Sequence, residues 1–565
     1  MKPQKSKIDL ILERVPPIIS WTLITMPFWG GFLFPEFTAN IVIFFNVYFL
    51  YKSISLTLFI FLSYLQLRSN DSINWLRRLE ELDDPQKAFD LLEVRYNDVK
   101  SSKYSEQLIK KSRYYPDSFE KIWHRILFLF AKRKSLGFIK SEQNRLSEVM
   151  NNPPSIDWKE LRHIVIIPHW KEPLTVLEDT IKRLKNLNYP THKISVVLAA
   201  EARDPEGIEK SHLLKQKYSE YFEHIWITEH EMQEGDLIGK SSNMAFASKE
   251  LNRLINELNW DPKLVTITSC DADSQLPSDY FANLTYYYIF DQDSIYKFYT
   301  GAVQLYANIW RLPFFARVKN SMSTIYNVGR LIRTDKLVPF STYTTSFWLI
   351  KEIGFWSPDI VPEDFHTFCK ALFKFPAKVA TVPLFQKIMS DAAEGEGSID
   401  TIKNNYFQER RWSWGISDDG WIIKNMIKSV LTGKATLRSL YISGHIVFDH
   451  ISGVGLALLV SLGGNIPLLI NPRFANTVVG FNLPIVSSFI IQITLLFFVL
   501  MIIVDSLMKP TIPGKMTFKR RILLLLEWIV QPITSIFMVT IPGFEAHTRL
   551  LFGKYLEYYL TKKKD

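Results

Sequence analysis

The sequence predicts a doubly wound, mostly parallel α/β sheet inserted between N- and C-terminal transmembrane helices. Two observations lead to this expectation. The 565-residue chain has an ordinary average composition, with 47% hydrophobic and 22% charged residues, but its apolar residues gather in residues 16–67 and 440–541. In the charged middle, short β-branched runs alternate with helical stretches, which is the pattern of parallel strands joined by helices. We therefore expect a membrane protein that carries a large water-soluble domain.

The N-terminal region, residues 1–72, is predicted to be a transmembrane hairpin. A basic start precedes an apolar stretch from Pro17 to Phe34, and no small-residue cleavage site follows it, which disfavours a signal peptide. The second run, Asn40 to Leu67, is long enough to span a bilayer even with Lys52 inside it. Basic residues flank the hairpin at both ends, and this places both ends on the cytoplasmic side.

Residues 73–160 are mostly polar with helical spacing and without clear strands, so we predict a helical cytoplasmic linker. The four predicted strands follow in residues 161–438. They are His163–Ile167, Ile194–Leu198, Ile225–Ile227 and Leu264–Thr268. Doubly wound sheets bind ligands at the carboxyl ends of their strands, so the residues directly after these runs are the first candidates for a site.

The C-terminal region, residues 439–565, is predicted to hold two further spans, Asp449 to Ile470 and Phe481 to Val504. A basic loop after them is cytoplasmic by the same rule. The last apolar stretch, Ile522 to Pro542, contains Pro532, which removes a helix hydrogen bond. We expect a broken, re-entrant or in-plane segment there, with a plain fifth span as the alternative.

Charge and cysteine content narrow the function classes. The chain has 67 Lys and Arg against 57 Asp and Glu, for a net charge of +10. The basic residues follow the apolar segments instead of forming a stripe on the soluble domain, which favours a membrane and disfavours nucleic acid. Two cysteines, Cys270 and Cys369, are too few for a disulfide framework and indicate a reducing compartment.

An acidic pair stands directly after the fourth predicted strand, in the tripeptide Asp271-Ala272-Asp273. Carboxylates one residue apart can hold Mg²⁺ or Mn²⁺, which then bridges the phosphates of a nucleotide. The alternative is a solvated turn at a strand end. A similar pair, Asp291 and Asp293, follows an aromatic run in an expected helix, so position favours the first pair.

Two later motifs add polar chemistry. Glu363 and Asp364 precede a helical stretch, Phe365 to Phe375, so they are either a helix cap or a general base with its neighbour. The run from Gln408 to Gly415 joins an amide, a guanidinium and indoles. Arginine suits a diphosphate through its two-pronged fork. The alternative for this run is an interfacial Trp and Arg cluster beside the membrane.

Taken in order, these motifs resemble the inverting family-2 glycosyltransferases. The likeness is to the membrane-embedded branch with cellulose, chitin and hyaluronan synthases, whose signatures are D, DxD, ED and QxxRW. It covers roughly residues 160–415 and implies a GT-A-like catalytic domain. The residues that carry the resemblance are Pro168, Glu172, Glu201, Gly239 to Asn243, Asp271, Asp273, Glu363, Asp364 and Gln408 to Trp412.

The resemblance implies a role for each of these residues. It assigns the nucleotide pocket to Pro168, Glu172 and Glu201, the donor phosphates to Lys240 and Asn243, and the nucleotide and metal to Asp271 and Asp273, with Asp273 on the ion. It makes Asp364 the general base, supported by Glu363. It implies that Gln408 and Arg411 close over the donor's diphosphate and that Trp412 binds the sugar end of the acceptor. One displacement at the anomeric carbon would invert its configuration.

Departures from the family pattern leave the donor base and the acceptor open. Glu201 stands where the family has Asp, with Asp204 as a rival, and we expect UDP in preference to GDP. The expected product is a growing polysaccharide made at the plasma or inner membrane. The alternatives are a single-transfer glycolipid synthase and a non-catalytic nucleotide-binding module. We also expect Tyr343 to Trp348 to line the acceptor site.

Overall fold

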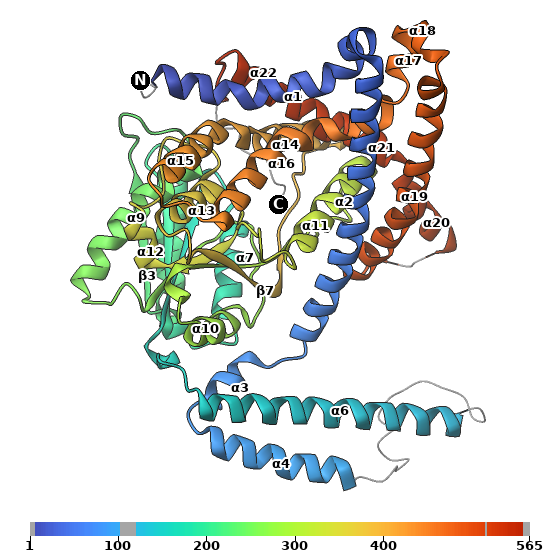
Figure 1. Ribbon diagram of the computed structural model, residues 1–565. Helices are drawn as coiled ribbons and strands as arrows, with labels where there is room; N and C mark the ends of the chain where they lie inside the picture. The colour runs from blue at the N-terminus through green and yellow to red at the C-terminus, as the bar shows by residue number, and fades with distance from the viewer. Residues whose placement is uncertain (1–5, 102–119, 515–516, 557–565) are drawn as a thin grey trace. The chain divides into compact units, whose positions relative to one another are not determined.

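The computed structural model describes residues 6–101, 120–514 and 517–556. The chain divides into two compact units (Figure 1). The first contains Met1–Ile73, Leu161–Tyr280 and Ile295–Asp565, and the second contains Asn74–Glu160 and Phe281–Ser294. The sheet and the long apolar helices all belong to the first unit.

The first unit is built on a seven-stranded mixed sheet in the order β3-β2-β1-β4-β6-β5-β7. Only β6 runs antiparallel to its neighbours, and the other pairs are parallel. The strands are β1 (Arg162–Pro168), β2 (Ile194–Glu201), β3 (His224–His230), β4 (Val265–Ser269), β5 (Lys297–Gln304), β6 (Tyr343–Ser346) and β7 (Ala380–Met389). The mostly parallel sheet is confirmed.

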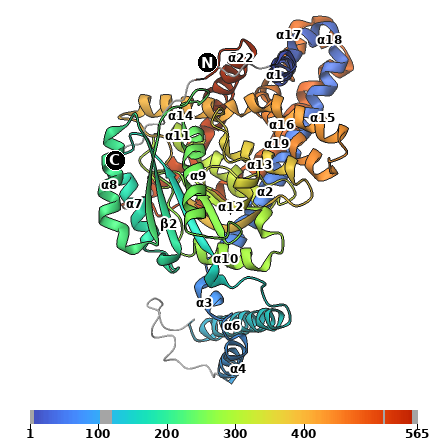
Figure 2. The same cartoon turned by 90° about the vertical axis from the view of Figure 1, so that its left-hand side faces the viewer.

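Helices cover the sheet on both faces, as a buried parallel sheet requires. All eight residues of β2 are buried, and Figure 2 shows α8 and α9 on opposite sides of this strand. The core between α9 and the sheet includes Ile164, Ile166, Val197 and Leu251. Between β1 and residue 436 the first unit contains the helices α7 (Leu174–Lys185), α8 (Pro205–Tyr218), α9 (Lys240–Glu257), α11 (Phe314–Arg330), α12 (Phe347–Glu352), α13 (Glu363–Lys374), α14 (Ser398–Ser413) and α15 (Asp419–Leu431). Helix α10 (Tyr280–Phe290) belongs to the second unit from Phe281 on.

Four helical segments of the described chain are long and apolar enough to cross a membrane. They are α2 (Pro35–Asn70), α16 (Leu437–Leu462), α19 (Val478–Met508) and the run Phe518–Leu551. In Figure 1, α2 and α19 lie side by side. Short helices α17 (Ile466–Ile470) and α18 (Pro472–Ala475) connect α16 to α19. The expected spans Asn40 to Leu67 and Phe481 to Val504 lie within α2 and α19. The expected span Asp449 to Ile470 overlaps only the second half of α16 and runs on into α17, because the helix begins at Leu437 and ends at Leu462.

The first expected span, Pro17 to Phe34, does not fall in a candidate membrane-spanning helix of the described chain. It falls in α1 (Lys7–Leu33), which contains Pro16, Pro17 and Pro27 and is not one of the four candidates among the described residues. Figure 1 shows α1 lying across the end of α2 instead of running antiparallel beside it. It packs closely on α15, where a Cβ at Gly420 would meet the Glu13 backbone at 2.7 Å. The N-terminal transmembrane hairpin stays a prediction.

The last apolar stretch is a continuous but irregular helical run. It consists of α20 (Phe518–Leu526), a 3₁₀ turn, α21 (Gln531–Ser535), a π turn at Ile536–Thr540 and α22 (Ile541–Leu551). The irregular turns gather around Pro532 and Pro542, since proline cannot donate to the helix ladder. By length and composition this run matches the alternative of a fifth apolar span. Its place in a bilayer stays a prediction.

The second unit is helical in its described residues. It contains α3 (Trp75–Glu80), α4 (Pro85–Ser101) and α6 (Glu120–Asn151). Arg145 lies 2.9 Å from Glu142, and Glu142 also pairs with Arg78. Burial opposes the charge of Glu142, but the two guanidinium groups outweigh it and lower the pKa of this carboxyl. The described residues of 73–160 contain no strand, as expected for a helical linker.

Candidate functional site

A cavity of about 1300 Å³ opens at the carboxyl ends of β1, β2 and β4 and extends to α2, α11, α14 and α16. The site residues expected from the motifs all line this cavity. They are Pro168, Glu172, Glu201, Lys240, Asn243, Asp271, Asp273, Glu363, Asp364, Gln408, Arg411 and Trp412. The rival pair, Asp291 and Asp293, belongs to the second unit and does not line it.

Lys240 joins the two acidic motifs. It is the first residue of α9 and follows Gly239, whose φ of 147° suits glycine. Its Nζ lies 2.7 Å from Asp271 Oδ1 and 2.8 Å from Glu363 Oε1. Burial opposes the ammonium charge, but the two carboxylates outweigh it and raise the pKa of Lys240 well above its usual value. The lysine is therefore charged at neutral pH.

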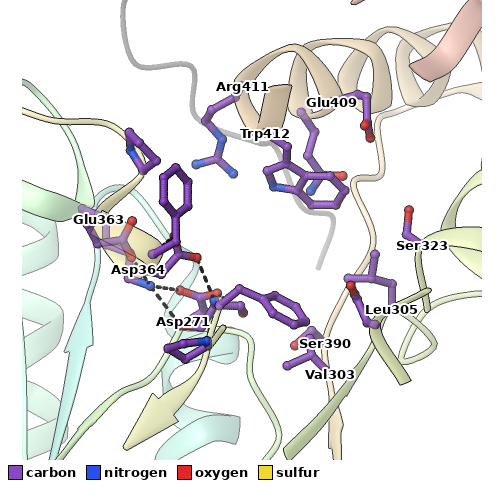
Figure 3. Close-up of a pocket in the computed structure, with 18 of the residues that line it drawn as sticks. Asp271, Val303, Leu305, Ser323, Glu363, Asp364, Ser390, Glu409, Arg411 and Trp412 are labelled. Carbon is purple, nitrogen blue, oxygen red and sulfur yellow. Dashed lines mark hydrogen bonds and ion pairs between the residues drawn. The ribbon is translucent and has the colours of Figure 1, made fainter. Parts of the chain in front are cut away.

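The two carboxylates at the start of α13 have different partners, and Glu363 is the one that pairs with Lys240. Glu363 is buried, and burial together with the charges of Asp364 and Asp271 raises its pKa, although Lys240 opposes the shift. Asp364 accepts hydrogen bonds from the backbone N–H of Ser341 at 3.1 Å and of Phe365 at 2.8 Å. Figure 3 shows Glu363, Asp364 and Asp271 close together at one wall of the cavity.

Ser341 is a site residue that the sequence analysis missed. Its hydroxyl donates to Asp271 Oδ2 at 2.6 Å while its backbone N–H donates to Asp364, so one residue links both motifs. Its φ of 59° is unusual for a non-glycine residue. Only the tertiary fold reveals it, because Ser341 lies in an irregular segment before β6 that carries no motif.

The expected nucleotide pocket is built from the ends of β1 and β2. Glu201 is 2% exposed, and its Oε2 lies 3.3 Å from His230 Nδ1 and 3.4 Å from Arg203 Nε. The rival Asp204 instead accepts from the backbone N–H of Lys171 at 2.7 Å and does not line the cavity. Of these two carboxylates, Glu201 is therefore the one that lines the cavity.

Two further residues shape this pocket. Glu172 accepts from the backbone N–H of Trp170 and so closes the turn after β1. Asn243 donates to the carbonyl of Ala199 at 2.8 Å, and this bond fixes α9 against β2. Both side chains also line the cavity.

The expected metal ligands occupy the strand end as the motif predicts. Asp273 is 7% exposed and accepts from the backbone N–H of Asp391 at 3.0 Å. The described residues contain no group of three protein carboxylates, histidines or cysteines suited to an ion. Two carboxylates nevertheless fit Mg²⁺ or Mn²⁺, because these ions take their remaining ligands from water and phosphate oxygens in nucleotide sites. The donor set fits such an ion.

The opposite wall of the cavity belongs to α14. Figure 3 shows Arg411 and Trp412 facing the acidic motifs from this helix. Lys319 of α11, whose side chain is fully buried, contacts three side chains near the end of α14. Its Nζ lies 3.1 Å from Glu409 Oε2, 3.5 Å from Gln408 Oε1 and 4.1 Å from the centre of the Trp412 ring. Burial lowers the pKa of Lys319 against the attraction of Glu409.

The expectation for Tyr343 to Trp348 is wrong. Residues 343–346 form β6 inside the sheet, where all four side chains are buried, and none of residues 343–348 lines the cavity. The Tyr343 hydroxyl accepts from Trp356 Nε1 at 2.9 Å. A run rich in threonine and aromatic residues is as typical of a central β-strand as of the lining of a binding site, and here it forms the strand between β4 and β5. Cys270 and Cys369 are both free and buried, as expected for residues of the domain interior.

Comparisons with known proteins add similarities of limited extent. The chain matches no protein-family model and no curated protein sequence. The mannosyltransferase PcManGT from Pyrobaculum calidifontis, in complex with GDP-Man and Mn²⁺, aligns with 14% identity and a TM-score of 0.39, over 73% of this chain and 94% of that chain. S. aureus TarS 1–349 in complex with UDP-GlcNAc aligns with 11% identity and a TM-score of 0.29, over 59% and 92%. At these TM-scores neither likeness bears on this chain's donor or acceptor.

Proposed function

We propose that the protein is a membrane-bound, inverting glycosyltransferase of the family-2 type with a GT-A-like domain on the cytoplasmic side. The observation that carries this proposal is the meeting of three separate acidic and basic motifs at the sheet's carboxyl edge. Lys240 touches both Asp271 and Glu363, and Asp364 faces the same cavity. A non-catalytic nucleotide-binding module would not need Asp364 beside the phosphate-binding residues.

The proposed reaction moves a sugar from a nucleoside diphosphate sugar, with UDP expected, to an acceptor hydroxyl. Asp364 takes the hydroxyl proton, and the acceptor oxygen forms a bond to the anomeric carbon from the opposite face. The bond from that carbon to the diphosphate breaks, and its electron pair leaves with the nucleoside diphosphate. Arg411 and Lys240 neutralise the charge that develops on the diphosphate. Mg²⁺ or Mn²⁺ held by Asp273 and Asp271 would add to this neutralisation.

The other residues of the cavity hold the donor. Pro168, Glu172 and Glu201 bound the nucleotide pocket, and Asn243 lies by the phosphates. Gln408 and Arg411 close over the diphosphate, while Trp412 offers a flat apolar face to the acceptor sugar. A growing polysaccharide is the acceptor expected from the QxxRW motif. The second candidate acceptor is a lipid, which is favoured because the cavity extends to the candidate membrane helices α2 and α16.

The test is release of nucleoside diphosphate by the full chain in detergent, screened over nucleotide sugars with Mg²⁺ or Mn²⁺. We expect turnover with one donor, loss of turnover on chelation of the metal, and loss of about 10²–10⁴-fold in Asp364→Asn. Nucleotide binding should persist in that variant, since Asp364 meets the acceptor.

Asp359→Asn is the matched control, because Asp359 is exposed and lies outside the cavity. Its turnover should equal that of the unaltered protein. If no donor turns over in the presence of lipid and oligosaccharide acceptors while nucleotide still binds, the transferase proposal fails in favour of the binding module.

A further inference from the structure

The membrane-facing end of the cavity carries a cluster of cations that the transfer reaction does not use. We call Lys52 of α2, Arg330 of α11, and Arg333 and Lys336 of the following loop the cationic cluster. All four line the same cavity as the acidic motifs. Arg330, Arg333 and Lys336 are close in the chain, whereas Lys52 lies far from them in the sequence and is brought to them only by the fold.

The cluster carries more positive charge than its neighbours neutralise. Lys52 pairs with Asp449 at 3.1 Å, and Arg333 pairs with Asp335 at 2.6 Å. The Arg330 guanidinium is a hydrogen-bond donor to the carbonyl of Val338 at 3.4 Å and lies over the rings of Tyr326 and Phe340. Within the part of the chain that the structure describes, no carboxylate lies within ion-pair distance of it. Two carboxylates thus face four cations. Such an excess in a partly buried cavity favours an anionic ligand.

Lys336 is a single side chain at which this excess of positive charge over negative charge is evident. Its Nζ lies 2.6 Å from His445 Nε2, and that nitrogen lies 3.1 Å from Asp449 Oδ2. Burial and the neighbouring Arg333 lower the pKa of Lys336 to about 8. An anion between Lys336 and Arg333 would relieve this repulsion, because each charged hydrogen bond to a phosphate oxygen is stronger than a neutral one.

An apolar track leads from the surface of the membrane helices to the cluster. Phe44, Tyr48 and Lys52 recur every four positions and so share one face of α2. The Phe44 and Tyr48 rings stack at 6.5 Å, and the Lys52 ammonium lies 5.2 Å from the Tyr48 ring. Phe448 of α16 meets Tyr48 at 5.7 Å, edge to face. Phe44 and Phe448 are 61% and 41% exposed, so a hydrocarbon chain can lie along both helices.

The other side of the cluster leads to the proposed reaction centre. Arg330 lies 5.5 Å from the Phe340 ring, and the next residue, Ser341, donates to Asp364. On α16, His450 lies beside Asp449 and packs on Phe365, 5.2 Å between ring centres. A headgroup held by the cluster therefore points along the cavity toward Asp364.

We propose that the cationic cluster binds the phosphate of a membrane lipid, whose acyl or isoprenoid chain lies on the exposed faces of α2 and α16. This lipid would be the acceptor, so that role rests on the proposed transferase function, whereas the binding does not. A soluble phosphate compound shares the headgroup chemistry but would not use the apolar track.

The test measures lipid binding to the full chain in detergent by native mass spectrometry, without nucleotide sugar. The probes are phosphatidylglycerol, diacylglycerol with the same acyl chains, and inorganic phosphate. We expect phosphatidylglycerol to bind about tenfold or more tightly than either comparator, because it alone offers both the charge and the chain. Lys336→Gln and Arg330→Gln should each weaken its binding about tenfold.

Two further variants keep the proposal falsifiable. Lys336→Arg retains the charge and should retain the affinity, and Lys434→Gln removes an exposed lysine outside the cavity and should change nothing. Unchanged binding in the two glutamine variants would overturn the proposal, as would equal loss in Lys336→Arg or Lys434→Gln. Inorganic phosphate binding as tightly as the lipid would indicate a soluble phosphate instead. If lipid binding behaves as expected but no donor turns over, only the transferase proposal fails.

Discussion

At the scale of single residues, the buried Lys319 determines how the α14 wall of the cavity is held. Its ammonium contacts Glu409 and Gln408 and lies over Trp412. We expect Lys319→Met to destabilise the protein by about 3 kcal/mol, because it leaves the Glu409 carboxylate without its partner. Thermal unfolding in detergent measures this loss.

The double variant Lys319→Met, Glu409→Leu separates stability from positioning. It should recover most of the lost stability, because no unpaired charge remains. Its KM for the acceptor should nevertheless be higher than that of the unaltered protein, since Trp412 has lost the cation that lies over its ring. A double variant with the KM of the unaltered protein would show that Lys319 does not position Trp412.

Lys336 gives a pH dependence to lipid binding. Its charge is present below a pKa of about 8 and is lost above it. The groups that face it are Arg333 and Asp335 on its own segment, Lys52 on α2, and His445 and Asp449 on α16. Affinity for phosphatidylglycerol, whose phosphodiester keeps its charge, should therefore fall about tenfold between pH 7 and pH 9.

Lys336→Arg is the control for this titration, because arginine stays protonated over the whole range. Its lipid affinity should not change between pH 7 and pH 9. A parallel fall in this variant would assign the pH dependence to another group.

At the scale of elements, the turn into α9 sets the position of Lys240. Gly239 has a φ of 147°, in a region that other residues rarely adopt. Gly239→Ala should cost about 1–3 kcal/mol in strain and shift Lys240 away from Asp271 and Glu363. Weaker nucleotide binding, measured by calorimetry, is the expected result.

Gly137→Ala serves as the comparison for that substitution. Gly137 lies in α6, and a Cβ there would meet nothing within 4 Å. This change should raise helix stability by about 1 kcal/mol and leave nucleotide binding unchanged. If both variants bind nucleotide alike, the glycine turn does not position the lysine.

At the scale of the whole molecule, the expected crossings by α2, α16 and α19 determine on which side of the membrane each connecting loop lies. Asn476, before α19, and Thr511, after it, are both exposed. Because one crossing separates them, Asn476→Cys and Thr511→Cys should lie on opposite sides of the membrane. An impermeant maleimide applied to sealed vesicles should label only Asn476→Cys, and Thr511→Cys should react after lysis.

The native cysteines allow a clean background for this experiment, since Cys270 and Cys369 are buried. The unaltered chain should show little labelling. Labelling of both single variants in sealed vesicles would mean that α19 does not cross, whatever its apolar length.

The sequence by itself determined the first four strands, the positions of α2 and α19, and the motif residues that meet in the cavity. These features are local: β-branched runs, apolar length and motifs at element ends can be recognised without knowing the contacts. Strands β5, β6 and β7 were not predicted, because β6 has only four residues and β7 contains Pro383, which weakens a strand pattern.

Tertiary structure alone decided the contacts that join distant segments. It placed Ser341 between Asp271 and Asp364, brought Glu201 but not Asp204 to the cavity wall, and buried Tyr343 in the sheet. It also gathered Lys52, Arg330 and Lys336 at one end of the cavity. The physical reason is the same in each case. A side chain's charge and neighbours depend on which segments pack against it, and residues far apart in the chain carry no local pattern that records this packing.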